Sequence, residues 1–395
     1  MADSKKYDGS QWEHSLRKLT TATEAVENPL YSDGTAITSY TIKGNEEHTG
    51  TPSPQNPVMP QGVGNKTANL FDYTYYDNTN LGGSGDSWFV NNNTAVVRIP
   101  CKSSTTYTIK FFVPESTVGN VFRVALCNSN NVPENNNPVP VTVIDRLSTG
   151  YNPYTLTTSS DTKYILLQVG IGAYLNILST TMIVEGSTAP SSYEPSGYKI
   201  PILSNGAALS PMYLSEQLMK KNDYVDSLAS SGTVTRKIKK LVLTGEENWL
   251  TYQSGALTVY NLQNITDYLR VSDNICMCTH YPTNDNVSGA VDAQYGISFI
   301  NSVSVSRLYL RDDNIASVNA LKQYLADQYA AGTPVTIWYV LAAPTTEQVT
   351  VPTIPTTEGA NSITVDTTVQ PSEFTATWSG WHNANVKEWD DSQWN

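Results

Sequence analysis

Short runs of β-branched and aromatic residues, separated by turns rich in Asn, Ser, Gly and Pro, recur along most of the chain. Clear examples are residues 107–111, 121–126 and 165–169. Runs of this length, bounded by turn-forming residues, predict strands rather than helices. Charged residues make up only 15% of the sequence, while Tyr, Thr, Ser and Asn are abundant. This is the composition of many short strands joined by polar turns, so we expect a mainly β protein.

The 395 residues are enough for two or three domains, each with its own core. The regular spacing of strands and turns after residue 66 predicts a jelly roll or β-sandwich. A second β-rich domain follows, and we expect the ends of the chain to be extended arms. The predicted regions are an N-terminal attachment region (1–66), the jelly-roll domain (67–200), a linker (201–235), the second β-rich domain (236–370) and a C-terminal aromatic tail (371–395).

One helix is predicted in the second domain, over residues 317–331. Four apolar residues would share a face of it, Ser317 can cap its first turn, and Gly332 with Pro334 would end it. The residues on that face are Val318, Leu321, Leu325 and Tyr329.

The two ends of the chain resemble each other. Tyr7 and Trp12 frame an Asp-Gly turn, and Trp389 and Trp394 frame an Asp-Asp turn. Both patterns suit a tight hairpin whose aromatic rings meet across the strands. Because an isolated hairpin is marginally stable in water, we expect these four residues to dock on a neighbouring subunit or another protein. Packing on their own chain is the alternative.

The patterns of charged and apolar residues argue against nucleic acid and membranes as partners. The net charge of -12 comes without the stripe of Lys and Arg that a row of phosphates would need, so nucleic acid is not expected as a partner. The basic run 236–240 alternates with Ile238 and is interpreted as a solvated strand face, with an anion site as the alternative. Apolar runs are too short to span a bilayer, and the first residues lead into no apolar segment, so neither membrane insertion nor a secretory signal is expected.

The sequence contains no motif of an enzyme. A G-x-S-x-G elbow and a P-loop are both missing. Cys276, Cys278 and His280 would share one face of a strand, but no second pair of ligands accompanies them, so buried thiols are expected there rather than a metal. The four cysteines are too few for a disulfide scaffold. We therefore expect no catalytic residues, no cofactor and no metal.

Exposed aromatic rings offer a different kind of site. Tyr73, Tyr75, Tyr76 and Trp88 cluster in the loop-rich opening of the predicted jelly roll. Flat Tyr and Trp faces can stack on sugar rings while polar neighbours bond the hydroxyls. These four residues are the candidate carbohydrate site. The alternative is a half-buried strand position, which is the more frequent place for a Tyr in a β protein.

Six segments together resemble phage and prophage minor structural proteins of Firmicutes, of the tail-fibre, baseplate or head-fibre type. They include Thr51-Pro52-Ser53-Pro54-Gln55-Asn56-Pro57 and Glu185-Gly186-Ser187-Thr188-Ala189-Pro190. The segments are residues 42–58, 64–72, 185–195, 197–201, 236–249 and 332–341.

This resemblance implies a carbohydrate-binding-module-like jelly roll in a virion protein that is assembled in the bacterial cytoplasm. It implies a homo-oligomer, with a trimer favoured, and other virion proteins as partners. The function it favours is display of β domains for binding host-surface polysaccharide. A purely architectural adaptor, decoration or head-fibre protein is the alternative.

Overall fold

The protein is mainly β in the computed structural model, which confirms the predicted fold class. The strands form antiparallel sheets, and α2 (Val318–Ala330) is the one helix among the described residues. No helix in this part of the chain is long and apolar enough to cross a membrane. The structure describes residues 6–7, 12–13, 30–32, 37–46, 50–71, 94–113, 122–127, 142–144, 150–170, 179–253, 258–263, 265–269, 275–284, 287, 295–302, 305–355 and 361–378.

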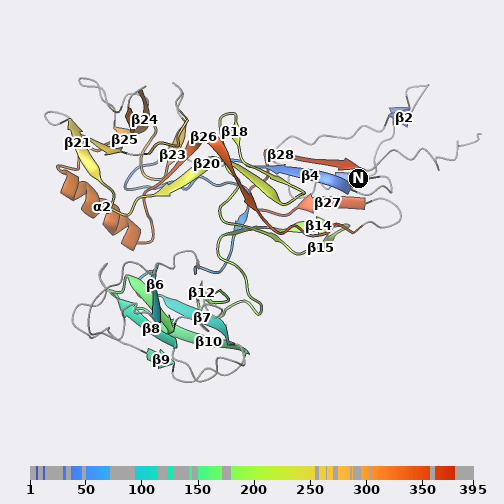
Figure 1. The fold of residues 1–395 in the computed structure, drawn as a ribbon, viewed down its shortest axis with the longest axis horizontal. Coiled ribbons are helices and arrows are strands. Elements are labelled where there is room, and N and C mark those ends of the chain that lie inside the picture. The colour runs from blue at the N-terminus through green and yellow to red at the C-terminus, as the bar shows by residue number, and fades with distance from the viewer. Residues whose placement is uncertain are drawn as a thin grey trace, which may run out of the picture.

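Seven strands form a β-sandwich, which lies below the rest of the molecule in Figure 1. One sheet has the order β6-β11-β8-β9 and the other the order β10-β7-β12. The strands are β6 (Thr94–Pro100), β7 (Thr106–Val113), β8 (Phe122–Cys127), β9 (Thr142–Ile144), β10 (Gly150–Thr157), β11 (Tyr164–Gly170) and β12 (Met182–Glu185).

The sandwich has a core of its own. Ile109 and Phe111 of β7 are buried in the same cluster as Ile165 and Leu167 of β11, so the two sheets pack face to face. In each strand the two residues are separated by one position, as expected when alternate side chains enter the core. Asn69 fixes the entry of the chain, because its Oδ1 accepts from the backbone N–H of Ile183 at 3.0 Å.

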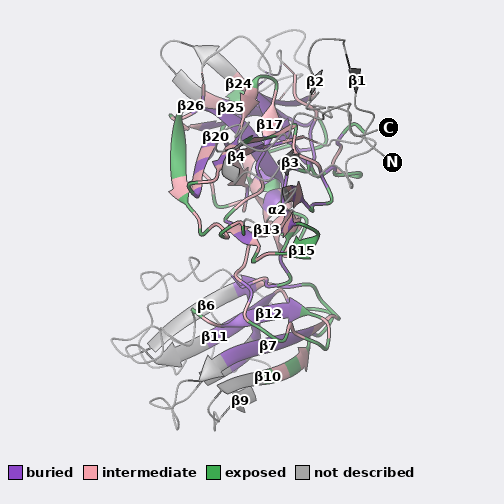
Figure 2. Ribbon diagram, turned by 90° about the vertical axis from the view of Figure 1, so that its right-hand side faces the viewer, coloured by how far each residue is buried: buried purple, intermediate pink, exposed green. Residues whose placement is uncertain are grey.

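The strands β3 to β5 and β13 to β28 form a second body, which we call the scaffold. It contains a six-stranded sheet, β23-β26-β20-β19-β4-β28, a four-stranded sheet, β21-β22-β25-β24, and smaller sheets. Figure 2 shows buried residues in the sandwich and, separately, in the scaffold. The scaffold strands are β3 (Leu30–Ser32), β4 (Ile37–Lys43), β5 (Asn65–Lys66), β13 (Tyr198–Ile200), β14 (Ile202–Ser204), β15 (Ala207–Ala208), β16 (Met212–Leu214), β17 (Lys220–Lys221), β18 (Tyr224–Val225), β19 (Ser227–Ala229), β20 (Thr233–Val242), β21 (Trp249–Gln253), β22 (Val259–Gln263), β23 (Cys276–Cys278), β24 (Gly296–Ser302), β25 (Val305–Arg311), β26 (Thr336–Gln348), β27 (Asn361–Val365) and β28 (Glu373–Trp378).

The scaffold is built from parts of the chain that the sequence predicts to be different regions. The six-stranded sheet takes β4 from the expected N-terminal arm and β28 from the expected C-terminal tail. Residues 201–235, expected to be a linker, instead supply β14 to β19 and the start of β20. Ile202 and Leu228 in this stretch are fully buried. Strands of two or three residues carry too little alternation to be recognised from sequence, which is why the stretch was interpreted as a connection.

The sandwich is an insertion between two neighbouring strands of the scaffold. The chain leaves through β5 and returns through β13, and these strands pair antiparallel with Lys66 opposite Tyr198. Just beyond this pair, the N–H of Thr67 donates to the carbonyl oxygen of Gly197 at 3.0 Å. The two ends of the insertion are therefore held side by side.

The helix α2 has the predicted cap and buried face. Ser317 Oγ accepts from the N–H of Ala320 at 3.2 Å, and Leu321 and Leu325 are fully buried. Gly332 follows the helix with a φ of 77°, a conformation that glycine adopts without strain. The helix packs its apolar face into the core that lies beneath the four-stranded sheet.

The pairing of β5 with β13 predicts that the scaffold folds without the sandwich. A variant in which Asn-Gly replaces residues 67–197 would join Lys66 to Tyr198 by a two-residue hairpin turn. We expect this excision variant to keep the unfolding transition of the scaffold, followed by near-UV circular dichroism and by the fluorescence of buried Trp249 and Trp338. An aggregated product, or loss of the native near-UV signal, would show that the two bodies fold only together.

Candidate functional site

Most of the site residues predicted from the sequence lie outside the described residues. This holds for Tyr73, Tyr75, Tyr76 and Trp88, and also for Trp389 and Trp394. The backbone of Tyr7 and Trp12 is described: β1 (Lys6–Tyr7) pairs antiparallel with β2 (Trp12–Glu13), with Tyr7 opposite Trp12. The N-terminal hairpin is thus present, whereas its docking on a partner remains a prediction.

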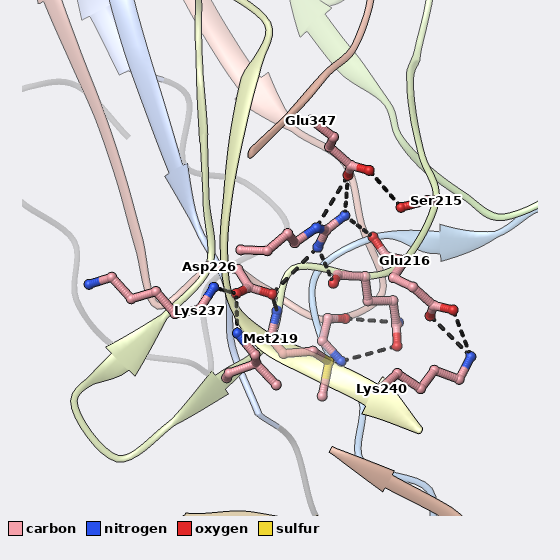
Figure 3. A network of polar contacts seen from close by, with 11 residues as sticks. Ser215, Glu216, Met219, Asp226, Lys237, Lys240 and Glu347 are labelled. Atoms are coloured by element: carbon pink, nitrogen blue, oxygen red, sulfur yellow. Dashed lines mark hydrogen bonds and ion pairs between the residues drawn. The ribbon is translucent and has the colours of Figure 1, made fainter. Parts of the chain in front are cut away.

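The described residues with the densest polar contacts lie close to the point where the sandwich is inserted. We call this group the junction; it consists of residues 215–219, Asp226, Arg236 and Glu347 (Figure 3). Arg236 lies on β20, Glu347 on β26, and the other residues lie on the chain between β16 and β19. Arg236 is only 8% exposed and Asp226 only 1%. Burying a guanidinium and a carboxylate costs free energy unless both groups are paired and hydrogen-bonded.

Every donor of Arg236 has a partner. Nε and one Nη donate to Glu347 Oε1 at 3.2 and 2.6 Å, and the same Nη donates to the Glu216 carbonyl oxygen at 2.7 Å. The other Nη donates to the Gln217 carbonyl oxygen at 2.6 Å and to Asp226 Oδ2 at 3.4 Å. A guanidinium has five N–H donors, so none is left for an outside anion.

Asp226 holds an irregularity in β20. The register against β26 shifts between Arg236 and Ile238, and at that point Asp226 Oδ1 accepts from the N–H groups of Lys237 at 2.7 Å and Ile238 at 3.1 Å. Its Oδ2 accepts from the N–H of Met219 at 3.1 Å. Burial raises the pKa of Asp226, and the Arg236 guanidinium and the three amides oppose that rise. The carboxylate thus replaces the strand partners that the bulge removes.

Gln217 connects the junction to the strand that leads into the sandwich. Its Nε2 donates to the carbonyl oxygens of Gly62 at 3.0 Å and Gly64 at 2.9 Å, and its Oε1 accepts from the N–H of Gly62. Gly62 has no room for a side chain, since a Cβ there would collide with Met219 Sδ and the Leu218 carbonyl oxygen. The segment before β5 is therefore clamped against the junction.

Three of the four basic side chains in the run 236–240 are paired within the chain. Arg236 is enclosed, Lys239 pairs with Asp267 at 2.5 Å, and Lys240 pairs with Glu216 at 2.8 Å. Asp226 and Glu347, the partners of Arg236 in this run, are not predicted from the sequence. No local pattern marks them, because Glu347 lies 111 residues from Arg236 and a lone Asp before a strand resembles any polar turn residue.

The cluster of Cys276, Cys278 and His280 is buried. Each is 2% exposed or less, and no group of three or more metal-ligand side chains occurs among the described residues. Burial raises the pKa of the Cys278 thiol to about 11. His280 lies beside Thr279 Oγ1 at 2.7 Å and Gln328 Oε1 at 3.4 Å, and burial lowers its pKa while the contact with Gln328 opposes that shift.

Comparison with protein-family models found no match for this chain, and comparison with curated proteins found none either.

Removing the junction arginine should destabilise the scaffold far more than removing an exposed lysine of the same strand. Arg236→Met leaves Asp226 buried without its counter-charge, so we expect the free energy of unfolding to fall by about 3–5 kcal/mol. The matched control is Lys239→Met, which breaks an exposed pair and should cost about 0–1 kcal/mol. Urea unfolding monitored by tryptophan fluorescence measures both. Equal losses in the two variants would mean that the junction is not a stabilising element.

The thiols provide a test of the buried cluster. Cys101, Cys276 and Cys278 are buried and free of disulfides, and the side chain of Cys127 lies outside the described residues. We therefore expect at most one thiol to react with Ellman's reagent in the native protein at pH 8, and all four to react in urea. Rapid reaction of two or more native thiols would contradict this arrangement, because only an exposed thiolate reacts rapidly.

Proposed function

We propose that this chain is a non-enzymatic structural protein of a phage particle, a tail-fibre or baseplate-type component that displays a β-sandwich for binding host-surface polysaccharide. The observation that carries the proposal is the insertion of the sandwich between β5 and β13, two strands paired at Lys66 and Tyr198. A domain inserted in this way projects from the body that holds it, as Figure 1 shows. The resemblance of six sequence segments to phage structural proteins supports the proposed place in a phage particle.

The junction supports the same proposal. It clamps the segment leading into β5 through Gln217 and has no free donor for a substrate on Arg236. On the return strand, Lys199 pairs with Glu194 at 2.6 Å, and Glu194 also accepts from the N–H of Ala68. Polar contacts thus hold both connections at the base of the sandwich. A rigid base is what a displayed binding domain needs, since it keeps the domain pointing outward at little entropic cost on binding.

The test compares the full-length protein with the excision variant. Both are labelled with a fluorophore and mixed with whole cells and purified cell-wall polysaccharides from a panel of Firmicutes strains. We expect the full-length protein to bind one or more of these, and removal of residues 67–197 to reduce the binding at least tenfold while the scaffold remains folded.

Two outcomes would contradict the proposal. Binding that is equal in the two proteins would move host recognition away from the sandwich. A full-length protein that is a monomer by light scattering, and that binds no strain of the panel, would favour an architectural adaptor or decoration protein instead.

A further inference from the structure

A buried histidine joins the end of β23 to the helix α2. His280 follows β23 and is 1% exposed. Its Nδ1 lies beside Thr279, and its Nε2 lies beside Gln328 of α2. An imidazole changes its charge near neutral pH, and a buried imidazole is stable only in the charge state that its neighbours accommodate. The hydrogen bonds around His280 therefore indicate which state the fold requires.

These hydrogen bonds fit a neutral ring. Thr279 Oγ1 accepts from the N–H of Thr336 at 2.9 Å, and the nearest acceptor for its own proton is His280 Nδ1 at 2.7 Å. The carbonyl oxygens of Pro334 and Thr336 are farther from that hydroxyl, at 3.4 and 3.5 Å. The network thus assigns the ring proton to Nε2, which faces Gln328 Oε1 at 3.4 Å. A second proton, on Nδ1, would meet the Thr279 hydroxyl donor head-on.

The titratable groups on the neighbouring elements give a protonated ring little support. Tyr324 of α2 meets the His280 ring edge-on, with centroids 6.5 Å apart, and burial raises the pKa of Tyr324 to about 12. Burial also raises the pKa of Cys278 to about 11, so both groups are uncharged. Asp312 belongs to the same cluster, but its carboxylate accepts from the Tyr281 hydroxyl at 3.1 Å and from the N–H of Asn314 at 2.9 Å.

The other segments around His280 bring no negative charge to it. Residues 50–64, in which the N–H of Val58 donates to the Thr279 carbonyl oxygen at 2.7 Å, contain no titratable side chain, and neither do residues 332–336. Asp327, next to Gln328 on α2, is exposed and accepts from Gln323. A protonated His280 would therefore be a buried charge without an ion-pair partner among these groups, which costs free energy.

Gln328 also holds the turn that follows α2. Its Oε1 accepts from the Thr333 hydroxyl at 3.1 Å, and its carbonyl oxygen accepts from the N–H of Thr333 at 3.1 Å. We call Thr279, His280, Gln328 and Thr333 the latch. Through these four residues the end of β23, the last turns of α2 and the start of the chain toward β26 are connected by side-chain hydrogen bonds.

The sandwich meets the scaffold directly beside the latch. Gly332 precedes Thr333, and a Cβ on Gly332 would lie 3.9 Å from Cγ of Lys102, in the turn between β6 and β7. Figure 1 shows α2 next to this end of the sandwich. We call the contact of Gly332 with Lys102 the seat. A lysine near the C-terminal end of a helix is electrostatically favourable. The seat is a second place of contact in addition to the pair of β5 and β13, so it restricts rotation of the sandwich about its two connections.

We propose that the latch is acid-sensitive: protonation of His280 releases the C-terminal end of α2 and, with it, the seat of the sandwich. The buried ring, the hydrogen bonds that fit only its neutral form, and the position beside Gly332 carry this inference. The sandwich then turns more freely on β5 and β13. The consequence for display of a binding domain rests on the proposed function, whereas the acid response itself does not.

The direction of the pH dependence follows from burial. Burial lowers the pKa of His280 below the ordinary value of 6.5, and among the described residues Gln328 opposes that shift. A ring released from the latch titrates near its ordinary value, so the open state takes up the proton more readily than the closed state. The latch is therefore closed above about pH 6.5 and weakens as the pH falls below this value. The loss is complete once the pH is below the pKa of the closed state.

The first experiment measures hydrogen–deuterium exchange of the full-length protein at about pH 7.5 and about pH 5, corrected for the intrinsic exchange rates. We expect protection to fall together in residues 325–333 and 101–106. The fall should be about tenfold for each pH unit by which the pKa of His280 in the closed state lies below 6.5. An unchanged protection of both segments would overturn the proposal. Loss in 325–333 alone would overturn the connection to the sandwich.

Replacing histidines identifies the group that responds. His280→Gln cannot take up a proton, so we expect equal protection at the two pH values. The matched control carries Gln in place of His14, His48 and His382, which leaves His280 as the one histidine of the chain. This control should keep the acid response, and NMR titration of its single imidazole should give a midpoint below pH 6.5. A midpoint at or above this value would overturn the proposal even if His280→Gln does not fold.

A carboxylate opposite the ring should reverse the effect. Gln328→Glu places a negative charge beside Nε2 of His280, which raises the pKa of that ring and stabilises its protonated form. We expect the acid response to become weaker or to disappear in this variant. An acid response equal to that of the parent would show that the contact between His280 and Gln328 does not control the end of α2.

The acid response is measured without any polysaccharide, so its outcome is independent of host binding. Exchange that responds to pH in a protein that binds no strain of the panel supports the latch and counts against the proposed function. Binding to host cells without any change in exchange at about pH 5 overturns the latch and leaves the proposed function standing.

Discussion

The pairing of Arg236 with Asp226 is the contact on which the arrangement of the scaffold depends. Burying two charges costs several kcal/mol for each ion, and their attraction repays that cost only if the remaining donors and acceptors are also satisfied. Here they are: the guanidinium has a partner for each of its N–H groups, and the carboxylate accepts three backbone N–H groups. The pair therefore fixes the bulge of β20 and, through the Gln217 backbone and side chain, the segment that enters the sandwich.

The junction buries polar groups next to strands of the scaffold. At the junction the groups pair with one another, so the free energy is recovered within the chain and the result is rigidity. Asn261, Ser298 and Arg307 of the four-stranded sheet keep atoms without a hydrogen-bond partner, so this part of the scaffold lacks the internal pairing that the junction has.

The sequence predicted the parts of this fold that follow local rules. Alternation and turn residues predicted the sandwich strands, and the spacing of Leu321 and Leu325 with the Ser317 cap predicted the helix. It did not predict that β4, β19 and β28 share a sheet. Such pairing joins residues such as Lys43 and Glu373, which are 330 positions apart, and its register is set by burial and bulges rather than by neighbouring residues. The partners of Arg236 were missed for the same reason.

The aromatic residues show that contacts between distant strands cannot be predicted from the sequence alone. The candidate carbohydrate site was predicted from aromatic residues that are close together in the sequence, namely Tyr73, Tyr75, Tyr76 and Trp88. Tyr252 stands alone and meets Tyr309 only through the pairing of three strands. One local signal was nevertheless present: β21 carries large apolar side chains on both faces, with Trp249 inside and Leu250 and Tyr252 outside. A strand at the edge of a sheet that presents apolar residues to solvent invites contact with another molecule.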